Sequence, residues 1–271
     1  MGQEAAAAGV DESRDARLLE HVRADPHDAH DPHPSEQHGC AEGRVNAPRA
    51  GRPTVVNFHG IGEPPAHVPP DEVPFWCPLD DWHRIADVLA VEVAGGAAVA
   101  ITFDDGNSSD VEHALPVLAE RDLTATFHVC AGRLDLPAYV DGSAVQHLRS
   151  SGMSIGSHGW DHVDLRALSD PDLVRAGRDS RQRLGEVCGE PVTSFAVPLG
   201  SYDRRVLGHL RDYRTVLTSD ATTWDGTDWI VPRWSYVRGW DAARVRSLAR
   251  GGESRRHRWR QRTSMAVKRR R

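Results

Sequence analysis

The chain has 271 residues, of which 39% are apolar, and a formal net charge of −6. This length suits one large domain or two small ones, and no run of about 18 apolar residues exists that could cross a membrane. Residues 1–250 are acidic overall and only residues 251–271 are basic, which argues against specific nucleic-acid binding by the main body.

The N-terminal residues 1–52 are rich in Ala, Asp, His, Pro and Gly, with almost no apolar clustering. Such a composition predicts a disordered tail. Its three closely spaced histidines at 27–33 are most simply interpreted as part of a solvated segment. The chain begins without a basic and apolar leader, and its four cysteines form no CxxC pattern, so we expect a cytoplasmic protein.

From residue 53, short β-branched runs alternate with stretches of helical spacing. The predicted strands are 54–59, 99–105, 125–130, 154–158, 194–198, 215–220 and 230–235. The predicted helices are 79–91, 110–120, 143–149, 170–187, 203–210 and 242–249, and Ser169 and Gly189 mark the ends of the fourth. The alternation indicates parallel βαβ units. Seven strands in about 200 residues suit a closed or nearly closed barrel, with an open doubly wound sheet as the alternative.

The C-terminal residues 251–271 contain nine Lys or Arg side chains with Trp259, Met265 and Val267 among them. We expect a basic tail with three possible fates. It can lie on an anionic membrane surface at the inner face, contact nucleic acid, or remain solvated.

Polar side chains gather where predicted strands end. Asp104 and Asp105 close the second strand and His158 closes the fourth, and barrel chemistry is concentrated at these carboxyl ends. Asp105, His158 and His162 together can bind one divalent cation, for which zinc is the default among several first-row metals. Asp104 is then free to act as a base. The simpler alternative is that Asp105 and His158 only cap a turn and a helix.

Three motifs carry a resemblance to a known family: TFDDG at 102–106, SHGWDH at 157–162 and FAVPLG at 195–200. At these residues the chain resembles the polysaccharide deacetylase family, carbohydrate esterase family 4, and the resemblance covers roughly residues 54–240. It implies a distorted (β/α)7 barrel and metal-dependent removal of acetyl groups from amino sugars.

The resemblance also implies roles for individual residues. Asp105, His158 and His162 would be the metal ligands, and Asp104 would be the catalytic base that activates a water for attack on the N-acetyl carbonyl. The third motif would line the substrate site with Pro198, Leu199 and Gly200.

Two positions depart from the family pattern. Ala196 stands where an arginine usually steadies the base, and Arg233 stands where a histidine usually serves as general acid. Because arginine cannot release a proton at neutral pH, Arg233 is expected to bind an anionic group or hold Asp104. His59 or His128 is then the substitute acid, although either can equally be a packed histidine.

Further substrate contacts are expected at the barrel rim. Trp160 lies between the two histidines and can stack on a sugar ring, although a tryptophan more often packs in a core. Asp220 belongs to one of two possible registers of a fourth motif, 220–224 or 225–229.

The sequence therefore predicts a catalytic domain at 53–250 that removes N-acetyl groups from an amino-sugar glycan or its precursor. Two alternatives stay open. One is a glycan-binding protein of the same fold with impaired catalysis, and the other is a metal amidohydrolase that acts on a non-sugar C–N bond.

Overall fold

The computed structural model describes residues 53–66 and 68–271, so the predicted N-terminal tail lies outside the described residues. The described chain forms one eight-stranded sheet in the order β7-β6-β5-β4-β3-β2-β1-β8, and every strand pair is parallel. The strands are β1 Thr54–Phe58, β2 Val99–Asp105, β3 Ala125–Val129, β4 Ser154–Ser157, β5 Ser194–Ala196, β6 Thr215–Thr218, β7 Ile230–Pro232 and β8 Trp234–Ser235.

The two edge strands of this sheet are neighbours in the sequence. Only Arg233 separates β7 from β8, yet β7 pairs with β6 and β8 pairs with β1. The predicted strand 230–235 is thus shared between both edges and brings them together, so the sheet is a nearly closed barrel. The barrel prediction is confirmed, and the open doubly wound sheet is excluded.

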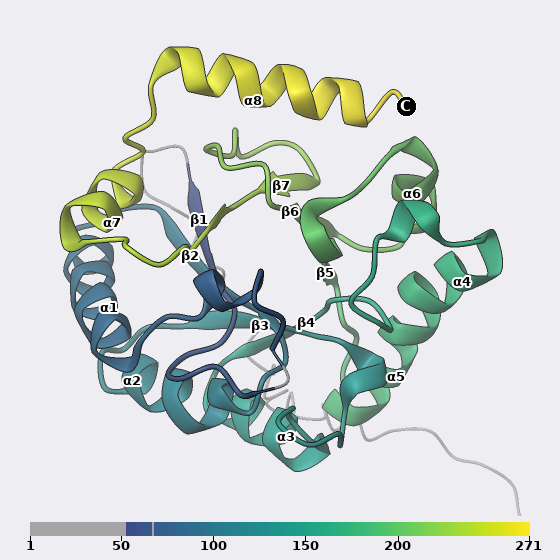
Figure 1. Ribbon diagram of the computed structural model, residues 1–271, viewed down its shortest axis with the longest axis horizontal. Coiled ribbons are helices and arrows are strands. Elements are labelled where there is room, and N and C mark those ends of the chain that lie inside the picture. Colours follow the sequence, from purple (N-terminus) through teal and green to yellow (C-terminus); the bar gives the residue numbers. More distant parts are fainter. Residues whose placement is uncertain (1–52, 67) are drawn as a thin grey trace, which may run out of the picture. The chain divides into compact units, whose positions relative to one another are not determined.

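Helices surround the strands, as Figure 1 shows. They are α1 Leu79–Ala94, α2 Leu115–Ala119, α3 Gly142–Ser150, α4 Asp170–Val174, α5 Ser180–Cys188, α6 Arg204–His209, α7 Ala242–Ala249 and α8 Arg255–Lys268. Two π-helical segments adjoin these helices: Asp110–Ala114 precedes α2, and Arg175–Asp179 connects α4 to α5. The predicted helix ends are confirmed, because the Ser169 side chain accepts from the Asp172 amide and Gly189 ends α5 with a φ of 72°.

Successive side chains along the strands face either the surrounding helices or the barrel interior. Phe58, Phe103 and Phe127 lie in register on β1, β2 and β3 and face the helices. Their neighbouring rings lie 5.5 and 4.7 Å apart, and all three are fully buried. Because successive side chains point to opposite faces, the alternate residues Thr102 and Asp104 face the barrel interior. The interior is therefore polar near the carboxyl ends of the strands.

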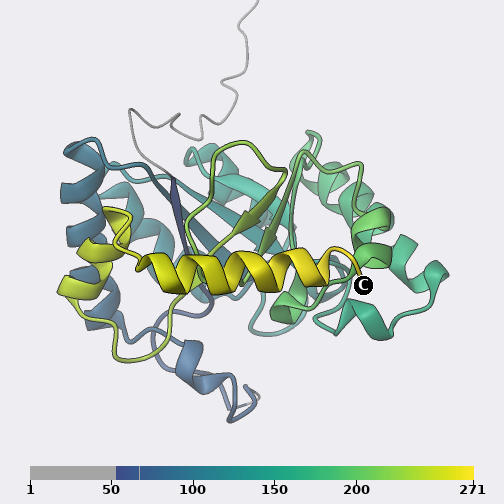
Figure 2. The same ribbon diagram turned by 90° about the horizontal axis from the view of Figure 1, so that it is seen from above.

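Helix α8 is an element that the sequence did not predict. No helix lies between β6 and β7, and α8 runs along the outside of these strands (Figures 1 and 2). Met265 is its buried residue, and Lys268 Nζ lies 2.6 Å from Asp220 Oδ1. The expected basic tail is thus a helix that completes the outer layer of the barrel. Within residues 53–66 and 68–271, no helix combines the length and hydropathy needed to cross a membrane.

Candidate metal centre and active site

Three predicted ligands meet at the carboxyl ends of β2 and β4. His158 Nε2 and His162 Nε2 each lie 3.6 Å from Asp105 Oδ1, and one ligand atom from each of the three residues lies within 4.8 Å of the others. Neighbouring ligands of a tetrahedral zinc ion are separated by roughly 3.4 Å, given bonds of about 2.1 Å. The spacing of the three side chains therefore fits one small divalent cation.

The hydrogen-bonding state of His158 prepares it for such an ion. Its Nδ1 lies 2.9 Å from the carbonyl oxygen of Ala196, and since a carbonyl only accepts, Nδ1 carries the proton. Nε2 then presents a lone pair toward Asp105. Burial lowers the pKa of His158 to about 4, so the imidazole is neutral at pH 7, as a metal ligand must be.

Unpartnered atoms give a second sign that these residues fit a cation. Asp105 Oδ1 and His158 Nε2 are both buried and lack a hydrogen-bond partner among the described residues, which is costly for polar atoms. Burial alone would raise the pKa of Asp105, but electrostatic interactions with His162, His59 and His158 outweigh it and lower the pKa. Asp105 also has a φ of 80°, a strained backbone conformation of the kind found at functional sites.

Asp104 is held by Arg233, which lies between β7 and β8 where the barrel closes. Arg233 Nη1 and Nη2 donate to Asp104 Oδ1 and Oδ2, both at 2.7 Å, and both side chains are buried. Burial would raise the pKa of Asp104, but the Arg233 guanidinium and the nearby histidines hold it well below its usual range. The carboxylate is therefore ionised and fixed in orientation.

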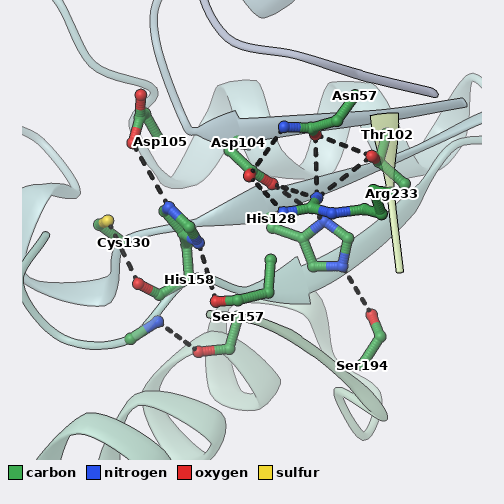
Figure 3. A network of polar contacts seen from close by, with 12 residues as sticks. Asn57, Thr102, Asp104, Asp105, His128, Cys130, Ser157, His158, Ser194 and Arg233 are labelled. Atoms are coloured by element: carbon green, nitrogen blue, oxygen red, sulfur yellow. Dashed lines mark hydrogen bonds and ion pairs between the residues drawn. The ribbon is translucent and has the colours of Figure 1, made fainter. Parts of the chain in front are cut away.

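Asn57 and Thr102 complete this buried network, as Figure 3 shows. Asn57 Nδ2 donates to Asp104 Oδ2 at 3.0 Å, and Arg233 Nη1 donates to Asn57 Oδ1 at 2.9 Å. Thr102 Oγ1 donates to the same amide oxygen at 2.8 Å. The arrangement settles the amide orientation of Asn57. Neither Asn57 nor Thr102 could be singled out from the sequence, because both look like ordinary strand positions.

His128 lies on the inner side of the same carboxylate. Its Nδ1 is 3.5 Å from Asp104 Oδ1 and its Nε2 is 3.2 Å from Ser194 Oγ. A Cβ added to Gly156 would meet the ring at 2.2 Å, so this position must be glycine. Burial lowers the pKa of His128 to about 3, and the ring has no exposed surface. His128 is thus a neutral packed histidine and not the substitute acid.

Comparisons with known proteins show similarity to deacetylases. Residues 92–216 match the family model described as polysaccharide deacetylase. A chitin deacetylase of Colletotrichum lindemuthianum is 28% identical over 113 residues, which make up 41% of this chain and 46% of that protein. A chitooligosaccharide deacetylase of Azorhizobium caulinodans is 27% identical over 139 residues, 51% of this chain and 63% of that protein. Over these residues the chain is similar to polysaccharide deacetylases.

Solved structures of deacetylases share the fold. A polysaccharide deacetylase from Bacillus cereus gives a TM-score of 0.63 at 18% identity, and the match covers 72% of this chain and 68% of the Bacillus chain. The Streptococcus pyogenes deacetylase PplD gives 0.62 at 18% identity and covers 74% and 98%. The chain spans less than two thirds of the length of the curated deacetylases that it matches.

Arg233 supplies the contact to Asp104 that the departure at Ala196 leaves without a side chain. Ala196 cannot steady the base through its side chain, but Arg233 reaches Asp104 from the segment that closes the barrel. Of the two expectations for Arg233, holding Asp104 is confirmed. Arg233 lies between β7 and β8 and forms this ion pair with Asp104.

His59 is the remaining candidate for a general acid. It follows β1, is half-buried, and its ring lies 5.4 Å from that of Phe75. Its charge contributes to lowering the pKa of Asp105, which places the imidazole near the metal ligands. Its Nδ1 is buried without a hydrogen-bond partner in the described chain.

The residues expected to contact the substrate differ in how accessible they are. Leu199 is 58% exposed on a residue with a φ of 58°, whereas Pro198 and Gly200 on either side are buried. Trp160 is half-buried, and the Arg175 guanidinium covers its ring at 4.6 Å. Leu199 is therefore available to a sugar, and one face of Trp160 is already occupied.

Asp220, which we expected to contact the sugar, instead binds side chains of the protein. The buried carboxylate accepts from Tyr202 Oη and Thr218 Oγ1, both at 2.8 Å, and from Lys268 Nζ at 2.6 Å. These partners fix α8 to the barrel, so we no longer assign Asp220 to the substrate. The second register, 225–229, lies in the crossover before β7, where Asp228 pairs with Arg269, the residue that follows α8.

Asp110 is a buried acid that sequence reasoning missed. It begins the turn before α2, and both of its carboxylate oxygens are buried without a partner among the described residues. Burial and the charges of Asp105 and Asp104 raise its pKa well above the usual range. Burial and the nearby Asp104 and Asp105 thus disfavour the ionised form of Asp110.

Proposed function

We propose that this chain is a metal-dependent hydrolase that removes N-acetyl groups from an amino-sugar glycan or its precursor. One observation supports the proposal most directly: Asp105, His158 and His162 converge on one point, and the ionised Asp104 adjoins them with no direct part in that cluster. The deacetylase names of its relatives support the substrate class.

The residues have distinct tasks in this reaction. A divalent cation bound by Asp105, His158 and His162 would supply Lewis-acid activation of water and of the acetamido carbonyl; zinc is our proposed ion. The Asp104 carboxylate accepts the proton of the attacking water, while Arg233 keeps it ionised and aimed.

The C–N bond then breaks, and the amine leaves with a proton that we assign to His59. The products are acetate and a free amino sugar. Leu199 contributes an apolar surface to one side of the substrate.

The alternative of an impaired glycan-binding protein loses part of its support. That alternative rested on the missing arginine at 196 and on the missing acid histidine at 233, and Arg233 removes the first ground because it supplies a contact to Asp104. The alternative of a non-sugar amidohydrolase differs only in substrate.

Acetate release from a panel of N-acetylated sugars and simple amides tests the proposal. We expect turnover on the sugars, and we expect Asp104→Asn to retain the cation while losing turnover by several orders of magnitude. Equal acetate release from the variant would contradict the assignment of the base, and turnover of the simple amides alone would favour the amidohydrolase.

We also propose peripheral contact with an anionic membrane, at the cytoplasmic side, through the outer face of α8. This face carries Arg256, Trp259, Arg260 and Val267, and Arg270 follows just beyond the helix end. All of these residues are exposed, and Trp259 is 71% exposed. Guanidinium groups and an interfacial tryptophan are the side chains that favour such surfaces.

Vesicle sedimentation tests this contact. Arg256→Glu combined with Trp259→Ala should abolish binding to anionic vesicles and spare activity on soluble substrates. Arg178→Glu, a matched change on another exposed arginine, should have no effect. Sedimentation that survives the α8 substitutions would contradict the membrane proposal.

A further inference from the structure

Arg133 is a cationic side chain beside the candidate metal centre that the reaction above does not use. It ends the 3₁₀ turn Ala131–Arg133 after β3, and its Nη1 lies 3.7 Å from Asp105 Oδ1. The guanidinium lies 4.9 Å from the centre of the Tyr139 ring. Its side chain is 24% exposed, and it donates no hydrogen bond to any described residue. Its fork of N–H donors is therefore available to a ligand.

The backbone around Arg133 is fixed to both loops that carry metal ligands. The Ala131 and Gly132 amides donate to the carbonyls of Gly159 and Trp160 at 2.9 and 2.8 Å, in the loop between His158 and His162. A Cβ on Gly132 would meet the Trp160 ring at 2.7 Å, so the close approach requires glycine here.

The segment that follows is attached to the loop after β2. The Ser108 amide donates to the Ala138 carbonyl and the Val140 amide to the Gly106 carbonyl, both at 2.9 Å. Tyr139, which stacks on Arg133, is thus held between these two contacts. The guanidinium is preorganised relative to Asp105 and is not a freely moving surface side chain.

Charge at the centre argues that Arg133 has a ligand. Asp104 is already neutralised by Arg233, so Asp105 is the carboxylate shared by a divalent cation and Arg133. Glu72 Oε1 lies 3.9 Å from His162 Nδ1, on the far side of that ring from Asp105. A fixed cation next to a cation site weakens metal binding, and an anion arriving with the substrate would offset that cost.

We propose that Arg133 binds an oxyanion carried by the sugar substrate, so that the substrate is an acidic N-acetylated sugar. Guanidinium groups recognise carboxylates and phosphates through paired hydrogen bonds. The oxyanion can be the carboxylate of an acidic sugar or a phosphate ester on the sugar. This inference rests on the proposed deacetylase function for its substrate, but the binding of the anion is a separate property of the chain.

The test compares Arg133→Gln with the wild-type protein on three N-acetylated sugars of matched size: one neutral, one with a carboxylate and one with a phosphate. We expect kcat/KM to fall on the order of 10- to 100-fold for an acidic sugar, as for lost hydrogen bonds to a charged group, and to change little for the neutral one. The sugar that loses more identifies the anion. Arg211→Gln, which removes another arginine stacked on an aromatic ring, is the matched control and should leave all three rates unchanged.

Two further measurements separate this inference from the proposed function. Calorimetric titration with zinc should show that Arg133→Gln binds the ion at least as tightly as the wild type, because a like charge has been removed. Titration with the de-acetylated acidic sugars should show weaker binding to the variant, whether or not turnover occurs. Equal losses on neutral and acidic sugars, weaker zinc binding, or unchanged binding of the acidic sugars would each overturn the proposal.

Discussion

The ion pair between Arg233 and Asp104 supports a sharp prediction for Arg233→Gln. Arg233 has no exposed surface and donates to Asp104 twice, to Asn57 and to Thr102. Removing the guanidinium leaves Asp104 as a buried charge without its main partner. Breaking a buried pair in this way costs about 3–5 kcal/mol, so we expect a loss of that size in the free energy of unfolding at pH 7.

The pH dependence of this loss has a definite sign. In the wild type the folded-state pKa of Asp104 lies below its unfolded value of about 3.9, so the stability from this group is complete above that pH and is lost only in stronger acid. In Arg233→Gln, burial would raise the folded-state pKa above the unfolded value. The variant should therefore recover stability as the pH falls from 7 toward 4, because its aspartate binds a proton on folding.

Urea denaturation of chelator-treated protein at several pH values measures both effects. The double variant Arg233→Gln/Asp104→Asn removes the titrating group, so the difference between single and double variants isolates Asp104. We expect that difference to be largest at pH 7 and to shrink in acid. A loss below about 1 kcal/mol in Arg233→Gln, or a difference independent of pH, would refute the assigned ion pair.

Three other predictions follow from the buried side chains. Gly156→Ala places a methyl group 2.2 Å from the His128 ring and 2.6 Å from Ser194 Oγ and should cost about 1–3 kcal/mol in urea denaturation. The same substitution should cost less in a His128→Ala/Ser194→Ala background, and an equal cost there would contradict the clash. Met265→Ala should cost about 2–5 kcal/mol and lower the calorimetric melting temperature, whereas an unchanged melting temperature would mean that α8 does not pack as described. The His158 ring, whose pKa burial lowers to about 4, should show no NMR titration between pH 5.5 and 8 in the metal-free protein; a midpoint near 6.5 would contradict its burial.

The strands and the metal ligands could be predicted from the sequence because the information is local. Strands of a parallel barrel are buried on both faces and appear as short apolar runs, and the polar residues Asp104, Asp105 and His158 stand out where such runs end. The spacing of His158 and His162 is also a local pattern. These features required no knowledge of how the barrel closes.

The role of Arg233 required the three-dimensional closure of the barrel. Arg233 and its partner Asn57 are 176 residues apart, and they meet because one segment belongs to both sheet edges. The sequence therefore left two uses of Arg233 open. For the same reason Asn57 and Thr102 were not recognised, since only the register shows that they face Asp104.

Helix α8 was missed for a different reason. A helix is usually recognised from an apolar stripe, and in α8 only Met265 is buried. Its attachment is largely polar, through Lys268 to Asp220 and through His257 Nε2 to the Ala221 carbonyl at 2.7 Å. Both partners of α8, Asp220 and Ala221, lie in the loop after β6. The sequence does not show that this loop packs against α8, so it suggests a substrate contact for Asp220 instead.

Cation stoichiometry measured together with acetate release tests the central claim most directly. After dialysis against zinc, the wild-type protein should contain one ion per chain and release acetate from an N-acetylated sugar. His158→Ala should contain none and release none. A wild-type protein without a bound ion, or a His158→Ala variant that retains the same stoichiometry, would contradict the assignment of Asp105, His158 and His162 as the metal centre.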